Sequence, residues 1–178
     1  WVAVSGPTVL QIGIAFTGAA LAVGARSAVL VSRSTDGGAS WGPAIPLIDD
    51  DGTRFFIVKE SLTIDSTDPS HVYAVWDRLD PSERGVTLLA RSTDGGVNWS
   101  PPVPIYDPGV ARQTIGNVAV TTPDGVVHVF FTELGPSASN PAVTEGRLAV
   151  IRSTDKGVTW SAPTWIAQLR AVGTRIPS

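Results

Sequence analysis

The chain has 178 residues, of which 43% are hydrophobic and 16% are charged, and its formal net charge is -3. These values predict a globular chain with a sizeable core rather than a disordered one. The acidic balance and the lack of a basic cluster argue against a nucleic-acid partner, because phosphate binding needs concentrated lysine and arginine.

The sequence also limits which metal and membrane sites are expected. It contains no cysteine, and its two histidines, His71 and His128, lie far apart in sequence. Disulfides and thiolate metal sites are therefore excluded, and a zinc site is not expected. The acidic triplet at 49–51 admits either a calcium site or a solvated turn, of which the turn is the more common. No apolar run reaches the roughly 18 to 20 residues of a membrane helix. We predict no metal, no cofactor and no membrane span.

Read from the N-terminus, the sequence predicts short strands separated by turns. The segments 1–17, 61–77 and 117–133 each hold two stretches rich in Val, Ile, Phe and Tyr around a short polar turn, which is typical of a hairpin. A third strand is predicted over 28–34, 86–92 and 147–153, and a fourth over 42–48, 101–107 and 162–168. No helical periodicity persists, and Pro and Gly punctuate every segment. The chain is therefore predicted to be all-β.

A short motif stands between each predicted third and fourth strand. The sequence RSTDGGASW at 33–41 recurs as RSTDGGVNW at 91–99 and RSTDKGVTW at 152–160, so that the three tryptophans are 58 and 61 residues apart. The pattern Ser-x-Asp-x-Gly-x-x-Trp suits a tight turn with glycine at positive φ and the aspartate accepting backbone hydrogen bonds. Three identical turns cannot form one asymmetric active site, so we interpret them as scaffold. The residues of the pattern are Ser34, Asp36, Gly38, Trp41, Ser92, Asp94, Gly96, Trp99, Ser153, Asp155, Gly157 and Trp160.

Four antiparallel strands in about 60 residues are typical of a β-propeller blade. We predict a single propeller segment over 1–178, with blades at about 1–52, 53–110 and 111–172 and the start of a further blade at 173–178. Closed propellers have about four to eight blades, so three blades leave two open edges. We therefore expect either part of a longer propeller or half of a six-bladed one, with self-association through the open edges in the second case.

The repeated pattern resembles the Asp-box of the sialidase-like, or BNR-repeat, β-propellers, and the resemblance covers the whole chain. It implies that the turns lie at the periphery, away from the active face. It also implies a glycan-active protein, an exo-α-sialidase or a related glycoside hydrolase, that is extracellular or at the cell surface. Asp-boxes also occur in sortilin-like receptors and assembly factors, so they indicate the fold more strongly than an activity.

The loops that do not contain the repeated turns are the candidates for a ligand site. If the turns occupy one face of a propeller, the loops between second and third strands and the connectors between blades occupy the other. These loops carry most of the charge of the chain. The densest cluster within one blade combines Lys59 and Glu60 with Asp77, Arg78 and Asp80. We predict that a glycan or another small polar ligand binds there.

The resemblance implies roles for several arginines. Sialidases clamp the substrate carboxylate with three arginines from different blades, because the guanidinium fork matches a carboxylate. Arg175 lies in an Arg-Ile-Pro motif like the one that holds the first of these arginines. Arg54 and Arg112 complete a triad with Arg175 if the blades are aligned on the tryptophans of the repeated turns. Alignment on the inner strands, the first strand of each blade, instead places Lys59 and Ile115 at the positions equivalent to Arg175.

The resemblance also implies the catalytic groups. The acid/base of the family is an aspartate in a second-to-third loop, which implies Asp77 or Asp80, and its nucleophile is a tyrosine activated by a glutamate, which implies Tyr106. The blade with these aspartates opens with Lys-Glu-Ser instead of Arg-Ile-Pro, and the sequence does not show which glutamate reaches Tyr106. The alternative function is a non-catalytic propeller that binds glycans or proteins through its polar face.

Overall fold

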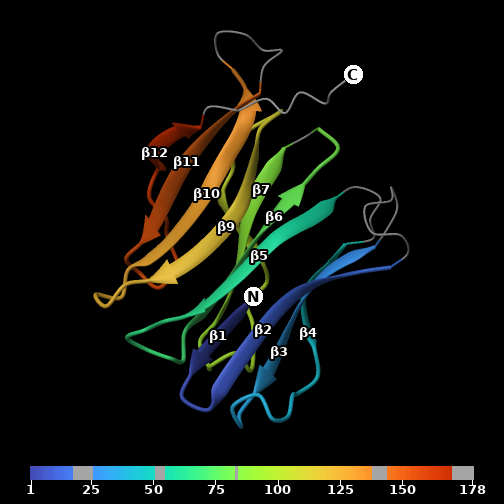
Figure 1. Ribbon diagram of the computed structural model, residues 1–178, viewed down its shortest axis with the longest axis vertical. Helices are drawn as coiled ribbons and strands as arrows, with labels where there is room; N and C mark the ends of the chain where they lie inside the picture. The colour runs from blue at the N-terminus through green and yellow to red at the C-terminus, as the bar shows by residue number, and fades with distance from the viewer. Residues whose placement is uncertain (18–25, 51–54, 83, 138–143, 170–178) are drawn as a thin grey trace, which may run out of the picture.

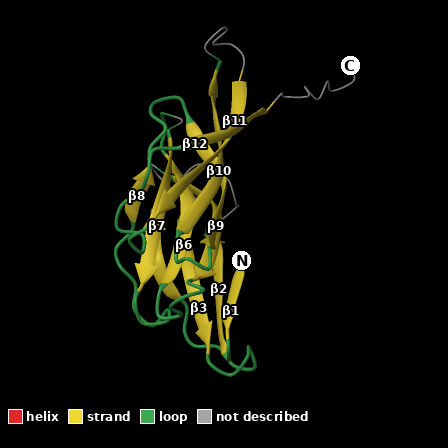
Figure 2. Ribbon diagram, turned by 90° about the vertical axis from the view of Figure 1, so that its left-hand side faces the viewer, coloured by secondary structure: helices red, strands yellow, loops and turns green. Residues whose placement is uncertain are grey.

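The structure is a computed structural model that describes residues 1–17, 26–50, 55–82, 84–137 and 144–169. This part of the chain is built from strands and contains no helix (Figures 1 and 2). The described residues accordingly include no helix that could cross a membrane. The strands are β1 (Val2–Ser5), β2 (Thr8–Phe16), β3 (Ser27–Ser34), β4 (Ile45–Asp50), β5 (Phe56–Ile64), β6 (Val72–Leu79), β7 (Gly85–Ser92), β8 (Val103–Tyr106), β9 (Gln113–Thr121), β10 (Val127–Pro136), β11 (Thr144–Ser153) and β12 (Thr164–Leu169).

The strands form three successive units of four. In each unit every strand pairs antiparallel with the strand before it, giving β1–β4, β5–β8 and β9–β12. The second and third units are joined by one parallel contact between Gly85 of β7 and Gln113 of β9. Figure 1 shows β5 running between the first unit and the strands of the third. The all-β class predicted from the strand pattern is confirmed.

The strand registers define equivalent positions in the three units. The serine that begins each repeated turn pairs with a valine of the second strand, Val9, Val72 or Val127. Counting from these pairs relates any residue of one unit to its counterpart in the next.

The second unit buries side chains against its two neighbours through both faces of its sheet. On β6, Val72, Ala74 and Trp76 pack into a core shared with the first unit, whereas Tyr73 and Val75 pack into a core shared with the third. Side chains alternate between the faces of a strand, so a strand covered on both faces reads as a continuous apolar run. This explains the sequence HVYAVWD, in which every residue from Val72 to Asp77 is buried.

The repeated turns are closed by their own serine and aspartate. In the first turn the Ser34 hydroxyl donates to Asp36 Oδ1 at 2.7 Å and accepts from the Gly38 amide at 2.9 Å. Asp36 also accepts from the Ser40 hydroxyl and amide, and these hydrogen bonds lower the pKa of Asp36 to about 2. The other two turns repeat the Ser-to-Asp and Gly-to-Ser bonds. The groups are therefore used within the turn, as the scaffold interpretation expects.

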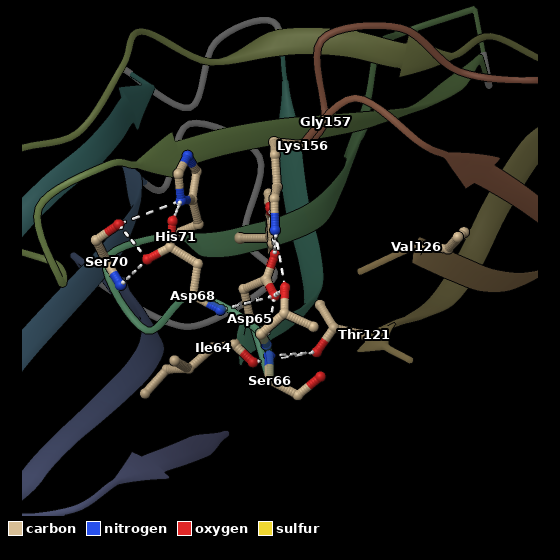
Figure 3. Close-up of polar contacts among 12 residues, drawn as sticks. Ile64, Asp65, Ser66, Asp68, Ser70, His71, Thr121, Val126, Lys156 and Gly157 are labelled. Carbon is tan, nitrogen blue, oxygen red and sulfur yellow. Dashed lines mark hydrogen bonds and ion pairs between the residues drawn. The ribbon is translucent and has the colours of Figure 1, made fainter. Parts of the chain in front are cut away.

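The third turn differs from the others because a lysine replaces a glycine. Lys156 has φ of 60°, close to the 73° and 72° of its counterparts Gly37 and Gly95. Figure 3 shows its ammonium reaching Asp65 of the second unit, with Nζ 2.8 Å from Oδ2. Asp65 is fully buried and also accepts hydrogen bonds from Thr67 and Tyr73. The ion pair links two units and gives a physical reason for a lysine in a left-handed conformation.

Candidate functional site

The ends of the units opposite the repeated turns hold the charged loops. There the inner strands β5 and β9 each contain a bulge. Residues 59 and 60 of β5 stand opposite one residue of β6, and residues 116 and 117 of β9 stand opposite one residue of β10. In this register Lys59 corresponds to Gly116, so the inner-strand alignment that placed Lys59 opposite Ile115 is wrong by one position.

The first residue of each bulge has a left-handed backbone. The φ angle is 57° at Lys59 and 73° at Gly116. Glycine adopts this conformation without a steric penalty, whereas lysine is strained in it. Bulges re-aim side chains and occur often beside functional sites, where strained residues also cluster. Lys59 is therefore a candidate for a functional residue on grounds independent of its charge.

The two bulges line a hollow of about 480 Å³ together with Trp1, Phe16 and Phe56. The rings of Phe16 and Phe56 stack with centroids 6.3 Å apart, and Trp1 is 53% exposed. Lys59 is exposed, and its ammonium forms no hydrogen bond or ion pair with another described residue. Aromatic walls with a few polar groups are typical of small-molecule sites. This hollow, which we call the axial hollow because the inner strands form it, is the candidate site.

Asp77 lies behind the bulge of β9 and does not reach solvent, since its exposed fraction is 0%. Its Oδ1 accepts hydrogen bonds from the Thr114 hydroxyl and from Asn117 Nδ2, the latter at 2.5 Å. Its Oδ2 is buried without a hydrogen-bond partner among the described residues. Burial raises the pKa of Asp77 to about 7, against the opposing effect of the two hydrogen bonds. The Asp77 carboxyl is therefore suited to positioning the β9 bulge, and it gains or loses its proton near neutral pH.

Arg78 and Asp80 belong to a different surface from Lys59 and Glu60. Arg78 follows Asp77 on β6, so its side chain projects from the opposite face of the strand. It forms an ion pair with Asp50 of the first unit at 2.6 Å, and it lies over the ring of Phe55. The predicted cluster of five charged residues is thus divided between the two faces of the second unit.

Asp80 closes its own loop. It accepts hydrogen bonds from the Ser82 hydroxyl at 2.5 Å and the Ser82 amide at 2.8 Å. The hydrogen bond from the hydroxyl is the main reason that its pKa lies below the usual value. The carboxyl is ionised at neutral pH, which is the state of a base or a turn cap rather than of a general acid. Asp80, Arg78 and Tyr106 line a separate groove of about 710 Å³.

Tyr106 has a glutamate partner. Its hydroxyl donates to Glu133 Oε2 at 2.5 Å, and the other oxygen of Glu133 accepts from Arg112 at 3.0 Å and Arg147 at 2.8 Å. Glu133 is only 3% exposed, so the two guanidinium groups compensate its buried charge. Burial and the hydrogen bond to Glu133 raise the pKa of Tyr106 above its usual range. Tyr106 is therefore held as a neutral hydrogen-bond donor.

Two of the predicted residues, Arg54 and Arg175, lie outside the described residues. The acidic triplet does not form a carboxylate cluster where it is described, because Asp49 pairs with Arg26 and Asp50 pairs with Arg78. Within the described ranges no group of three or more His, Cys, Asp or Glu residues is placed to hold a metal ion.

Several residues of these sites were not selected by the sequence analysis. Glu133 meets Tyr106, and Thr114 and Asn117 meet Asp77, across more than 20 residues of sequence, so no local pattern marks them. The aromatic residues of the axial hollow resemble ordinary strand residues in sequence. One signal was available: Lys59 is the counterpart of a glycine, which a correct register of the inner strands would have revealed.

Comparisons with known proteins place the fold. No family model and no curated protein sequence matches the chain. Among solved structures, the chain is similar to an α-L-arabinanase of Penicillium chrysogenum complexed with arabinobiose, with a TM-score of 0.66 and 13% identity over 91% of this chain and 45% of that one. It is also similar to the sialidase of Trypanosoma rangeli in complex with the inhibitor DANA, with a TM-score of 0.54 and 15% identity over 90% of this chain and 27% of that one.

These similarities define the class of protein by its fold. The three units are blades of a β-propeller, and the chain spans less than half the length of either of these structures. The sialidase-like β-propeller fold predicted from the repeated turns is thereby confirmed, and at these identities the likeness concerns the fold alone.

Proposed function

We propose that this chain forms part of a glycan-binding propeller whose ligand occupies the axial hollow. The observation that carries the proposal is the composition of that hollow: three aromatic side chains, Trp1, Phe16 and Phe56, stand beside a strained lysine whose ammonium forms no hydrogen bond or ion pair with another described residue. A sugar ring has an apolar C–H face that packs on aromatic rings and a polar edge that hydrogen-bonds to charged groups.

The two similar structures support a carbohydrate ligand. One is described with arabinobiose and the other with the inhibitor DANA, and both are propellers of the same class. The axial position also supports it, because the blades of a propeller surround a central channel. Glu60 lines the hollow next to Lys59, so a ligand there meets a cation and an anion side by side.

Titration with arabinobiose and with a sialylated trisaccharide, followed by tryptophan fluorescence and NMR, tests this proposal. Trp1 lies in the hollow, so its emission is expected to change on binding. We expect Phe56→Ala and Lys59→Ala each to weaken binding by about tenfold or more, a loss of about 1.4 kcal/mol. Arg84→Ala is the matched control, since Arg84 is a partly exposed cation that pairs with Asp107 beside the other groove. Equal affinity in all variants, or no binding of any glycan on an array, would contradict the proposal.

Hydrolysis of a glycoside is the second candidate. The Tyr106–Glu133 pair and the proton of Asp77 favour it, since a tyrosine with a glutamate and a carboxylic acid are the groups that sialidase-like hydrolysis uses. The burial of Asp77 and the raised pKa of Tyr106 favour binding alone. A fluorogenic sialoside and an arabinan assay separate the two: turnover that Tyr106→Phe abolishes would establish the hydrolase, and binding without turnover would exclude it.

A further inference from the structure

Asp77 differs from the other buried carboxyl groups in its partners. Within the described ranges the buried carboxyl groups are those of Asp50, Asp65, Asp77 and Glu133. Each of the other three forms an ion pair with an arginine or a lysine. Asp77 forms no ion pair with a described residue, and its hydrogen bonds come from neutral side chains. Because an ionised carboxylate buried without a cation is unfavourable, Asp77 is the buried carboxyl that is most easily protonated.

The neutral partners of Asp77 come from the strand that forms one wall of the axial hollow. Thr114 and Asn117 both lie on β9, and both donate to Asp77 Oδ1. The hydroxyl of Thr87 on β7 lies 2.8 Å from that of Thr114 and 3.3 Å from Asn117 Oδ1, which completes a buried network between the second and third units. Asn117 and its neighbour Gly116 line the axial hollow. One end of the network therefore meets the wall of the hollow.

The hydrogen bonds determine which oxygen of Asp77 takes the proton. Oδ1 already accepts from two side chains, whereas Oδ2 has no partner among the described residues. The proton therefore belongs on Oδ2, where it displaces no hydrogen bond. Its arrival leaves the bonds from Thr114 and Asn117 in place but removes the negative charge that strengthens them. The β9 bulge is thus held tightly by ionised Asp77 and more loosely by neutral Asp77.

The charged groups on the neighbouring strands do not supply a cation to Asp77. On β10, Glu133 stands opposite Thr114, so it faces the same junction. Two arginines compensate its charge. On β6, Arg78 projects from the face opposite to that of Asp77 and is paired with the first unit. Both groups are therefore already balanced by partners of their own.

Lys59 and Glu60 are the remaining charges near Asp77, and they stand on the side of the hollow. Both line the hollow from the β5 bulge, next to Val58, which pairs with Asp77. Burial raises the pKa of Asp77, and the hydrogen bonds from β9 and the charge of Lys59 oppose this effect. The like charge of Glu60 acts in the same direction as burial. The contents of the hollow therefore bear on the charge of Asp77.

A ligand in the axial hollow favours the neutral form of Asp77 for two reasons. It covers the wall formed by Gly116 and Asn117, and so removes water from the neighbourhood of the buried carboxyl. Loss of water disfavours the ionised form. An anionic ligand also pairs with Lys59, which weakens the attraction between that lysine and the carboxylate. Both effects have the same sign.

We propose that Asp77 is a positioning residue of the axial hollow and that it takes up a proton when a ligand binds there. This role rests on the proposed function, since the ligand is the glycan of the axial hollow. A ligand that favours protonated Asp77 binds more tightly when Asp77 is protonated, so its affinity falls as pH rises through neutrality. The fall is larger for an anionic glycan than for a neutral one, because only the anion also pairs with Lys59.

Calorimetric titration with arabinobiose and with a sialylated trisaccharide, in buffers of different ionisation enthalpy, measures the protons taken up. We expect uptake of a fraction of one proton per ligand near neutral pH. We also expect affinity to fall by about three- to tenfold between about pH 5.5 and about pH 8.5. Asp77→Asn keeps an acceptor for both hydrogen bonds but cannot ionise, so neither effect is expected in it. Asp124→Asn is the matched control, because it removes an exposed carboxyl from the turn after β9, and it is expected to behave as the unaltered protein.

The amide NMR signals of Gly116 and Asn117 test the role of Asp77 without a ligand. We expect these signals to titrate near neutral pH in the unaltered protein and not in Asp77→Asn. The calorimetric and NMR measurements on the unaltered protein need no variant, so they decide the matter even if Asp77→Asn does not fold. Signals that do not titrate would overturn the role of Asp77.

The outcomes separate this role from the proposed function. If no glycan binds, the proposed function fails, and the Gly116 and Asn117 signals still decide whether Asp77 controls the wall of the hollow. If a glycan binds without proton uptake, or with release of a proton, the proposed function stands and the role of Asp77 is overturned. A pH dependence of affinity that persists in Asp77→Asn would overturn it too, because another group would then carry the proton.

Discussion

Two residues at the axial end, Asp77 and Lys59, are held in states that their ordinary chemistry disfavours. Asp77 is a carboxyl group buried with one oxygen unpartnered, and Lys59 is a β-strand lysine with a left-handed backbone. Both belong to the wall of the axial hollow or lie directly behind it. Unfavourable states of this kind persist only where the surrounding structure enforces them, and they give separate measurable consequences for pH and for stability.

Asp77→Asn is expected to change how stability depends on pH. The folded pKa of Asp77 is raised from 3.8 to about 7, so the unfolded state loses this proton first as pH rises. The stability that the protonated Asp77 contributes to the folded state is fully present below the pKa of the unfolded state. It is lost as pH rises through the folded pKa of about 7, and the loss is on the order of a few kcal/mol. The neutral asparagine variant lacks this loss. Urea denaturation of both proteins at about pH 5 and about pH 8 measures it. Parallel pH dependences in the two proteins would argue against a raised pKa.

Lys59→Gly is expected to stabilise the fold and to weaken ligand binding. Glycine at φ of 57° removes the strain and should raise the free energy of unfolding by about 0.5 to 1 kcal/mol. Lys59→Ala is the matched variant, because alanine also lacks the ammonium but keeps a Cβ atom at the strained position. Thermal denaturation and glycan titration of both variants are compared. If the glycine variant is less stable than the alanine variant, the left-handed backbone at residue 59 does not carry the strain inferred here.

At the scale of elements, the repeated turns are connectors as well as hairpin ends. The second turn satisfies its own backbone, receives the side chain of Leu10 from the preceding unit, and accepts a hydrogen bond from the arginine of that unit, Arg33. The third turn adds an ion pair from Lys156 to Asp65. The turns therefore carry tertiary as well as local information, which is why they repeat more closely than the strands around them.

Gly96→Ala is expected to be much more damaging than Gly38→Ala. Both glycines have positive φ, at 86° and 93°, so alanine introduces similar backbone strain at each. Only at Gly96 would the new Cβ also meet Leu10 at 2.7 Å. We expect a difference of about 1 to 3 kcal/mol in the free energy of unfolding, the usual range for overpacking. Urea denaturation of the two variants measures this difference. Equal destabilisation would show that the contact between the units can relax.

Lys156→Met is expected to destabilise the junction between the second and third units. It removes the cation beside buried Asp65, whose pKa is lowered by Lys156 and Thr67 despite burial. Because Asp65 keeps its bonds from Thr67 and Tyr73, we expect a loss of about 1 to 3 kcal/mol rather than the full cost of an isolated buried charge. Lys156→Gly separates the ion pair from the backbone strain. Denaturant unfolding at neutral pH measures both, and an unchanged midpoint for Lys156→Met would contradict this role.

At the scale of the whole molecule, the structure is a row of similar units that share cores. The middle unit is buried on both faces, whereas the outer faces of the first and third units expose apolar side chains such as Val4 and Phe130. In such repeat structures most stability comes from the interfaces between neighbours.

The sequence by itself determined the strands, the units and the fold class. Alternating or continuous apolar runs depend on local geometry, and the copied Ser-x-Asp-x-Gly-x-x-Trp turn closes through residues four positions apart, so both are visible without a partner. The roles of Asp77, Asp80, Tyr106, Glu60, Arg78 and Arg112 in catalysis or binding stay predictions.

Only the tertiary structure decided which charged side chains meet. It turned Arg78 away from Asp77, brought Glu133 to Tyr106, and placed Lys59 in a bulge equivalent to that of Gly116. The physical reason is that a strand presents successive residues to opposite faces, and a single bulge reverses that assignment for every residue beyond it. Contacts between units join residues more than 20 positions apart, and no local pattern encodes them.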